Sequence, residues 1–255
     1  MSAETVLSLK NVRKRYGAVT VTDDVSFTVD RGDRVALIGP NGAGKTTLFN
    51  LIAGRTPVSS GSIELNGRDI TTSREEVRCR AGIGRTFQHS ELFASLDATG
   101  NVLMALRRRH GISRSIIPSR KREARLTVEA HEFLDAVGLD PRGSSRVSDL
   151  SHGQRRQLEV AMALALEPDL LLFDEPTAGM SGAETRTFSE LVSNLPRSLA
   201  MILIEHDLDV VFALADKVIV LAAGAVIAEG EPSTIRGSAE VQDAYLGTNL
   251  GEVFL

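Results

Sequence analysis

A run of glycines followed by a lysine and a threonine is the part of the chain best suited to chemistry. Residues 39–47 read GPNGAGKTT and fill every fixed position of the pattern G-x-x-x-x-G-K-[ST]. Glycines let backbone N–H groups turn around a phosphate, while the lysine and a hydroxyl reach the outer phosphates and Mg²⁺. The candidate phosphate-binding residues are Gly39, Asn41, Gly42, Ala43, Gly44, Lys45, Thr46 and Thr47. A glycine-rich turn with a buried structural lysine is the competing interpretation, but it does not require this complete match.

The segments on either side of this loop fit the strand–loop–helix order that the pattern requires. Residues 34–38 are mostly apolar and lie between glycines, which is typical of a short buried strand. Residues 47–53 have the composition of the first turns of a helix. The loop and its context therefore predict binding of a nucleoside triphosphate.

Two acidic residues stand at the end of a second apolar strand. Residues 170–173 read LLLF and lead into Asp174 and Glu175. A strand of a parallel sheet delivers such residues to the edge where α/β folds bind ligands. Asp174 is then placed to hold Mg²⁺ through water, and Glu175 to polarise an attacking water. A strand that merely ends at a polar turn is the plainer interpretation.

A third apolar strand, predicted at residues 201–204, ends just before Glu205 and His206. From the same sheet edge, the His206 side chain can donate a hydrogen bond to a terminal phosphate. A lone histidine is more often structural, so this assignment depends on the phosphate loop nearby.

Three weaker features complete the candidate site. Tyr16 lies at a turn upstream of the phosphate loop, where its ring can stack on a nucleobase or simply face solvent. Gln88 follows a predicted strand and can offer its carbonyl oxygen to a metal or a water. Ser151 and Gly153 precede a helix predicted at residues 159–166, and they offer a hydroxyl and a backbone N–H to a second anion. A capped helix with no ligand would show the same two residues.

The hydrophobic pattern predicts the elements that position these residues. Alternation of apolar and polar residues indicates strands, and apolar residues three and four apart indicate helices. Further strands are predicted at residues 4–10, 19–29, 62–65 and 83–87 and in a hairpin of 218–221 with 225–228; helices are predicted at 101–108 and 120–137, the second stopped by Gly138. A short polar tail is expected at the end. The pattern predicts an α/β fold that carries an inserted helical segment.

The helical segment is rich in basic side chains. They are Arg107, Arg108, Arg109, Arg114, Arg120, Lys121, Arg122 and Arg125. Such a cluster can meet acidic lipid headgroups or a membrane partner. We prefer the plainer interpretation of a solvated helical face with acidic partners such as Glu123 and Glu129.

Composition narrows the class of protein. The 255 residues are 42% hydrophobic and 24% charged, which is ordinary for a globular chain. The net charge of −4 argues against nucleic acid as the main partner. The single cysteine, Cys79, excludes an internal disulfide and fits a reducing compartment. The N-terminal residues lack a signal-peptide pattern and no apolar run is long enough to span a bilayer, so we expect a cytoplasmic protein.

Taken together, the motifs resemble those of the ATP-binding subunit of an ABC transporter over nearly the whole chain. The most specific is the sequence LSHGQ at residues 150–154, because other phosphate-loop NTPases lack this signature. The resemblance implies a single ABC ATPase domain: a P-loop NTPase (RecA-like) core with an antiparallel β subdomain and an inserted α-helical subdomain. The expected boundaries are 1–88 and 167–235 for the core, 89–166 for the helical subdomain and 236–255 for the tail.

The resemblance also implies which ATP each residue contacts. One ATP with its Mg²⁺ is bound by Tyr16, the phosphate loop, Gln88, Asp174, Glu175 and His206; among them, Thr46, Gln88 and Asp174 face the metal. Ser151, Gly153 and Gln154 serve the ATP of a partner chain, which is a second copy or a sister subunit. Permease subunits hold such ATPases at the inner face of the cell membrane, and an external solute-binding protein acts with them.

Within this family, several segments are similar to the branched-chain amino acid importer ATPases, in particular the larger of the two that those systems pair. They are residues 84–89, 92–93, 204–207 and 244–247 and the basic helical stretch. The lipopolysaccharide-export ATPase shares some of these features. Two rival functions are that of a soluble assembly ATPase of the iron–sulfur scaffold type and that of a non-hydrolysing nucleotide switch.

Two positions depart from the family pattern. His152 stands where glycine is commonest in the signature, and Ser181 stands where aspartate is frequent in the loop after Glu175. The second departure puts the contact expected there across the dimer in doubt.

Overall fold

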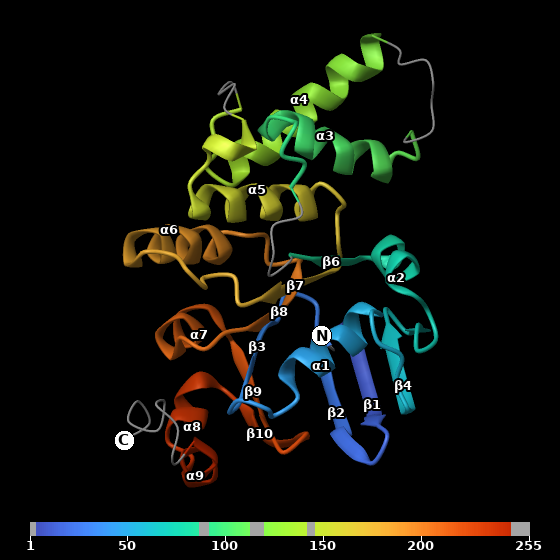
Figure 1. Cartoon of the computed structure of the whole chain (residues 1–255), viewed down its shortest axis with the longest axis vertical. Helices are drawn as coiled ribbons and strands as arrows, with labels where there is room; N and C mark the ends of the chain where they lie inside the picture. The colour runs from blue at the N-terminus through green and yellow to red at the C-terminus, as the bar shows by residue number, and fades with distance from the viewer. Residues whose placement is uncertain (1–3, 87–91, 113–119, 142–145, 246–255) are drawn as a thin grey trace. The chain divides into compact units, whose positions relative to one another are not determined.

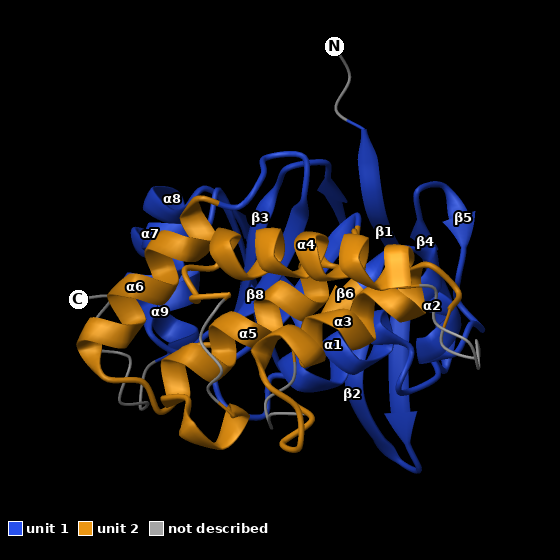
Figure 2. Cartoon of the chain, turned by 90° about the horizontal axis from the view of Figure 1, so that it is seen from above, with its two compact units in different colours: residues 1–83, 169–175, 195–255 blue, residues 84–168, 176–194 orange. Residues whose placement is uncertain are grey.

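A computed structural model describes residues 4–86, 92–112, 120–141 and 146–245. The chain divides into two compact units, coloured separately in Figure 2. Unit 1 comprises residues 1–83, 169–175 and 195–255, and unit 2 comprises residues 84–168 and 176–194. Gln88 lies outside the described residues.

A largely parallel sheet runs through unit 1 (Figure 1). Within unit 1 its strand order is β10 (Ala225–Gly230), β9 (Lys217–Ala222), β3 (Arg34–Ile38), β8 (Ala200–Ile204) and β7 (Leu170–Asp174). Of β6 (Ile83–Arg85), only Ile83 belongs to unit 1. β3 pairs in parallel with both β8 and β9, and β7 pairs in parallel with β8. The predictions of strands at 34–38, 170–173 and 201–204 and of the final hairpin are confirmed, because continuous apolar runs are typical of strands buried on both faces.

An antiparallel sheet forms the other layer of unit 1. Its order is β2 (Val19–Asp30), β1 (Thr5–Tyr16), β4 (Ser60–Leu65) and β5 (Arg68–Asp69). The predictions of strands at 4–10, 19–29 and 62–65 are confirmed, and β1 extends six residues further than predicted, to Tyr16. Asn66 and Gly67 have φ of 49° and 71°, so they form the tight turn with two positive φ values that an Asn-Gly pair favours.

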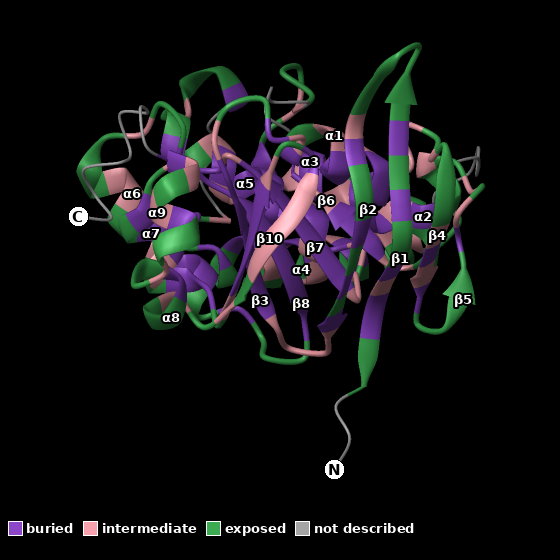
Figure 3. Cartoon of the chain, turned by 90° about the horizontal axis from the view of Figure 1, so that it is seen from below, coloured by how far each residue is buried: buried purple, intermediate pink, exposed green. Residues whose placement is uncertain are grey.

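The helices of unit 1 are α1 (Lys45–Ala53), α2 (Glu75–Ala81), α7 (Leu208–Leu214), α8 (Pro232–Arg236) and α9 (Ala239–Tyr245). One hydrophobic cluster joins α1 to strands of both sheets, and β3 and β8 are purple, meaning buried, in Figure 3. Within the tail that the sequence places at residues 236–255, residues 239–245 are helical. They form α9, whose Val241 and Tyr245 are buried, since two apolar side chains four residues apart face inward.

Arg78 of α2 is a buried cation that ties α2 to α1. Its Nη1 donates to the carbonyl oxygens of Leu51 and Ile52 at 2.7 and 2.8 Å, while Nε and Nη2 donate to those of Ser73 and Thr71, both at 2.9 Å. Burial lowers the pKa of Arg78 to about 10, so the group is still charged at neutral pH. The guanidinium thus supplies hydrogen-bond donors to carbonyl groups in the last turn of α1.

Replacing Arg78 with methionine should lower the free energy of unfolding by on the order of 3 kcal/mol, because buried carbonyl oxygens lose their donors. Chemical denaturation measures this change. Arg80→Met is the matched control, since Arg80 lies exposed on the same helix. Equal stability of the two variants would show that the Arg78 contacts contribute nothing.

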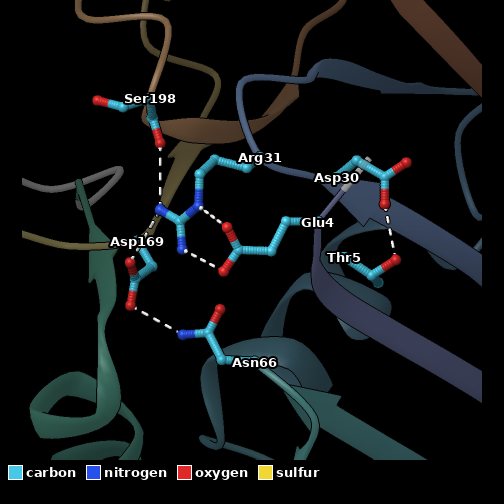
Figure 4. A network of polar contacts seen from close by, with 7 residues as sticks. All are labelled: Glu4, Thr5, Asp30, Arg31, Asn66, Asp169 and Ser198. Carbon is cyan, nitrogen blue, oxygen red and sulfur yellow. Dashed lines mark hydrogen bonds and ion pairs between the residues drawn. The ribbon is translucent and has the colours of Figure 1, made fainter. Parts of the chain in front are cut away.

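A polar network holds together chain segments that are distant in sequence within unit 1 (Figure 4). Arg31 donates to both carboxylate oxygens of Glu4 at 2.9 and 3.2 Å, and also to Asp169 at 3.2 Å and to the carbonyl oxygen of Ser198 at 3.4 Å. Asn66 donates to the other oxygen of Asp169 at 2.8 Å. The bonds to Glu4 and then Asp169 raise the pKa of Arg31. This network links the start of β1, the β4–β5 turn and the residue before β7.

Unit 2 contains α3 (Ala98–Arg109), α4 (Arg120–Ala136), a short 3₁₀ helix (Val147–Asp149), α5 (His152–Leu164) and α6 (Gly182–Ser193). The predictions of helices at 101–108 and 120–137 are confirmed, and Gly138 follows α4 with a φ of 75°. α4 buries Leu126, Ala130 and Leu134 at the predicted spacing. The prediction that the next helix begins at residue 159 is wrong, because Ser151 caps α5 and the helix begins seven residues earlier.

Some basic side chains of unit 2 have the acidic partners that were predicted. Arg107 contacts Glu123, and Arg109 contacts Glu129, so part of the positive charge is neutralised between α3 and α4. No helix among the described residues is long and apolar enough to cross a membrane.

Candidate active site

The carboxyl ends of three parallel strands bring the predicted residues of unit 1 to one sheet edge. Leu37 of β3 and Asp174 of β7 both lie in register with Ile204 of β8. The phosphate loop leaves β3 at Gly39, and His206 follows Ile204 by two residues. Such an edge is where open α/β sheets bind their ligands.

The phosphate loop has a backbone that only glycine fits at two of its positions. Gly39 has a φ of 150°, and a Cβ there would lie 2.0 Å from the carbonyl oxygen of Leu221. Gly44 has a φ of 98°, and a Cβ there would lie 2.6 Å from the carbonyl oxygen of Val21. Gly44 also caps α1 without any side-chain hydrogen bond. The first N–H groups of α1 therefore meet no side-chain acceptor from their cap, as an anion-binding loop requires.

Lys45 lies at the first position of α1 and is buried. Its Nζ donates to the carbonyl oxygens of Gly39 at 2.6 Å and Pro40 at 3.1 Å, so the ammonium closes the loop. Burial lowers the pKa of Lys45, and the negative charge of Glu175 partly offsets this effect. A phosphate at the loop would compensate the charge of this desolvated ammonium far better than two carbonyl groups do.

Glu175 and His206 form a direct pair. The Nε2 atom of His206 lies 2.7 Å from Oε1 of Glu175. An ionised carboxylate only accepts hydrogen bonds, so Nε2 carries the proton in this pair. Glu175 has a φ of 46°, a strained value for a residue with a side chain, and its N–H donates to the carbonyl oxygen of Ile204 at 2.9 Å. Strain of this kind is concentrated at functional sites.

Asp174, Thr46 and Tyr16 are further candidates of unit 1, and they lie on β7, α1 and β1. Asp174 is buried as the last residue of β7, and Thr46 is exposed in the first turn of α1. Tyr16 ends β1 with 52% of its surface exposed, and the ammonium of Lys14 lies 4.8 Å from the centre of its ring. The ammonium makes a cation–π contact with one face of the ring.

The signature residues of unit 2 form the start of α5. The Ser151 hydroxyl accepts from the Gln154 N–H at 3.2 Å, and the Gln154 side chain accepts from the Ser151 N–H at 2.9 Å. This reciprocal pair is a capping box at the start of a 13-residue helix. Ser151, Gly153 and Gln154 therefore lie together as the sequence predicts.

The two departures from the family pattern have clear structural roles. His152 Nε2 lies 3.0 Å from the carbonyl oxygen of Ala178 and must donate to it. Ser181 caps α6, because its hydroxyl accepts from the N–H of Glu184 at 3.3 Å. Serine thus replaces aspartate as a good N-cap residue.

Two residues contact the candidate site although no sequence pattern points to them. The Glu184 carboxylate accepts hydrogen bonds from Ser151 and Gly153. Tyr245, at the end of α9, is 1% exposed and makes a hydrogen bond with the Gly39 backbone. Burial raises the pKa of Tyr245 to about 12, and the Gly39 bond acts in the opposite direction, so the Gly39 N–H is the donor.

Tyr245→Phe should weaken nucleotide binding and lower the free energy of unfolding by about 1 kcal/mol, because the Gly39 N–H loses its buried acceptor. Nucleotide titration and chemical denaturation measure the two effects. Val241→Ala is the control, since it removes buried packing from the same helix without changing this bond. Nucleotide affinity that falls equally in both variants would contradict a specific role for the hydroxyl.

The residues present fit a nucleotide phosphate with Mg²⁺. The loop glycines make room for phosphate oxygens, and Lys45 supplies a desolvated positive charge. No group of three or more histidine, cysteine or acidic side chains in the described ranges could hold a metal by itself. Mg²⁺ that is bound by substrate phosphates needs only one or two protein oxygens, such as those of Thr46 and Asp174.

The fold and this sheet-edge site define a phosphate-loop nucleoside triphosphatase. The profile of the ABC transporter family matches residues 22–178. The chain is a member of that family, and it is an ATP-binding ATPase. ATPase subunits of such transporters dimerise and work with membrane permease components.

Similar proteins match nearly the full length of the chain. It is 32% identical over 252 residues to the high-affinity branched-chain amino acid transport ATP-binding protein LivG of Salmonella typhimurium, covering 96% of this chain and 99% of the relative. It is 34% identical to the corresponding protein BraF of Pseudomonas aeruginosa, covering 95% and 98%. The ADP conformation of MJ1267, an ATP-binding cassette of an ABC transporter, matches with a TM-score of 0.82 and 28% identity, covering 95% and 99%.

Proposed function

We propose that this chain hydrolyses ATP to drive an importer of branched-chain amino acids. The observation that carries the proposal is the Glu175–His206 pair at 2.7 Å, located at the same sheet edge as the phosphate loop. The amino acid assignment is supported by the relatives LivG and BraF, whose names state that class of solute and which match over nearly the whole chain.

The ATP contacts divide between base, phosphates and metal. The exposed ring of Tyr16 stacks on the adenine, and residues 39–47 surround the phosphates with Lys45 on the outer ones. Thr46, Asp174 and Gln88 would hold Mg²⁺ directly or through water. Bound there, Mg²⁺ would neutralise charge that develops on the phosphate oxygens.

Glu175 and His206 act on the terminal phosphate. Glu175 orients a water molecule and takes its proton as the water oxygen bonds to the γ-phosphorus. The bond from that phosphorus to the bridging oxygen breaks, and ADP and phosphate leave. His206 holds the Glu175 carboxylate through its Nε2 proton before reaction and donates to the γ-phosphate when ATP is bound. Lys45 stabilises the charge on the transferred group.

Hydrolysis requires a second ATPase chain. Ser151 and Gly153 donate to the γ-phosphate of ATP held by the partner, and Gln154 holds Ser151 through the capping box. The partner is a second copy or a sister subunit. Permease subunits hold the pair at the inner face of the membrane, and an external binding protein delivers the solute.

The proposed solute is tested by uptake in cells. Cells that lack the chain should lose high-affinity uptake of radiolabelled leucine, isoleucine and valine. Native chain should restore it, whereas a chain with Glu175→Gln should not. Loss of uptake of another solute class alone would contradict the amino acid assignment, and unchanged uptake of every solute tested would contradict the importer.

A further inference from the structure

Glu184 links the starts of two helices in unit 2. Its Oε1 atom accepts from the Ser151 hydroxyl at 3.0 Å and from the Gly153 N–H at 3.2 Å. Its Oε2 atom accepts from the N–H of Ser181 at 3.0 Å and from the Ser181 hydroxyl at 2.9 Å. One carboxylate thus receives two donors from the start of α5 and two from the start of α6.

These hydrogen bonds fix the charge of the group. They lower the pKa of Glu184 to about 2, and the largest contribution comes from the Ser181 backbone, followed by the Ser181 side chain, Gly153 and Ser151. Glu184 is therefore an anion throughout the physiological pH range. The signature donors, the Ser151 hydroxyl and the Gly153 N–H, therefore already bond to a negatively charged group.

A capping box explains only half of this arrangement. In α6, Ser181 and Glu184 satisfy each other, and this uses Oε2. The two bonds to Oε1 belong to a different helix and serve no purpose in capping α6. Packing is also close, because a Cβ added to Gly153 would lie 3.1 Å from both Cγ and Oε1 of Glu184.

Ser151 and Gly153 are the donors that the proposed function assigns to the γ-phosphate of the partner's ATP, and the inference rests on that function. A carboxylate oxygen and a phosphate oxygen are both anionic, so they compete for the same hydroxyl and N–H. We propose that Glu184 occupies the signature anion site until the partner's ATP displaces its Oε1 atom. Glu184 is thus a positioning residue that sets the ATP concentration at which the paired sites fill.

When its Oε1 atom is displaced from Ser151 and Gly153, the Glu184 carboxylate is still held through its other oxygen. Its Oε2 atom retains both donors of Ser181 when Oε1 moves away from α5. The γ-phosphate therefore has to replace Glu184 only in the two hydrogen bonds of Oε1, while the two bonds of Oε2 remain. In the absence of ATP, the same two bonds keep the Ser151 hydroxyl and the Gly153 N–H satisfied and oriented.

The test compares Glu184→Gln with Glu190→Gln in the complete transporter complex purified from membranes. Both variants remove one negative charge from α6, but Glu190 is exposed and lies outside this network. A neutral amide has a single acceptor oxygen, so it can accept from Ser181 or from Ser151 but not from both, and it competes more weakly with phosphate. The half-saturating ATP concentration for hydrolysis should fall by a factor on the order of three to ten in Glu184→Gln and stay native in Glu190→Gln.

ATP binding to the isolated chain shows whether a substitution has also changed the phosphate loop. In both variants the isolated chain should bind ATP with native affinity. An unchanged or higher half-saturating concentration in Glu184→Gln would overturn the inference. If that variant does not fold, Glu184→Asp replaces it, because the shorter carboxylate reaches Ser181 but withdraws from Ser151, and the same fall is expected. Ser151→Ala tests the proposed function separately: unchanged hydrolysis in that variant would refute the signature's role itself.

Discussion

A chain with Glu175→Gln should bind ATP as tightly as the native chain and hydrolyse it about 10²- to 10⁴-fold more slowly. Glutamine keeps the size of the side chain and can still accept the hydrogen bond from His206 Nε2, which spans 2.7 Å to Glu175 in the native chain. It cannot take a proton from water. The substitution therefore removes the base and leaves the phosphate-binding groups in place.

Phosphate release and equilibrium nucleotide binding, measured on the same preparation, check both halves of this prediction. Glu231→Gln is the matched control, because Glu231 is exposed before α8 and makes no side-chain cap there. Hydrolysis at the native rate in Glu175→Gln would show that another group activates the water. Loss of binding would show that Glu175 mainly maintains the structure of the loop.

Lys45→Met, unlike Glu175→Gln, should weaken nucleotide binding itself. The Lys45 ammonium is buried and donates to the carbonyl groups of Gly39 and Pro40, which carry no full negative charge. Replacing it removes charge-assisted bonds to phosphate, so ATP affinity should fall about 10- to 100-fold. Folding should persist, since burial already disfavours the ammonium and lowers its pKa.

Nucleotide titration with calorimetric detection measures this loss, and chemical denaturation checks the fold. Lys10→Met is the control, because Lys10 lies exposed on β1 and pairs with Glu64 at 2.9 Å. ATP affinity that survives in Lys45→Met would contradict the assignment of residues 39–47 as the phosphate site.

The parts of the site that depend on local sequence were predictable. The phosphate loop needs a strand before it and a helix after it, and β3 and α1 provide both. Asp174 and His206 could be placed at one edge because their apolar strands had to lie in a parallel sheet. The direct contact between Glu175 and His206 depends on the register of β7 and β8, which no local pattern specifies.

Two elements were missed or misplaced because their apolar residues are few. Residues 152–157 of α5 are polar or glycine, so the hydrophobic period begins only at Leu158, although the spacing of Ser151 and Gln154 is typical of a helix start. The seven residues of α9 have two buried side chains, Val241 and Tyr245, which is too few to define a period.

The contacts of Glu184 and Tyr245 could not be predicted for a different reason. Glu184 meets Ser151 across 33 positions of sequence, and Tyr245 meets Gly39 from the far end of the chain. The spacing of Ser181 and Glu184 is typical of a capping box, which concerns α6 alone. Only the packing of α6 against α5 decides that the second oxygen of Glu184 reaches the signature.

The most direct test of the account is to purify the chain with its companions from solubilised membranes and identify them, while measuring ATP hydrolysis by the purified material. We expect integral membrane permease subunits, a second ATPase chain and ATP hydrolysis that the Glu175→Gln variant lacks. Recovery of soluble companions alone, or of none under conditions that preserve such complexes, would contradict the transporter assignment and favour a soluble assembly ATPase.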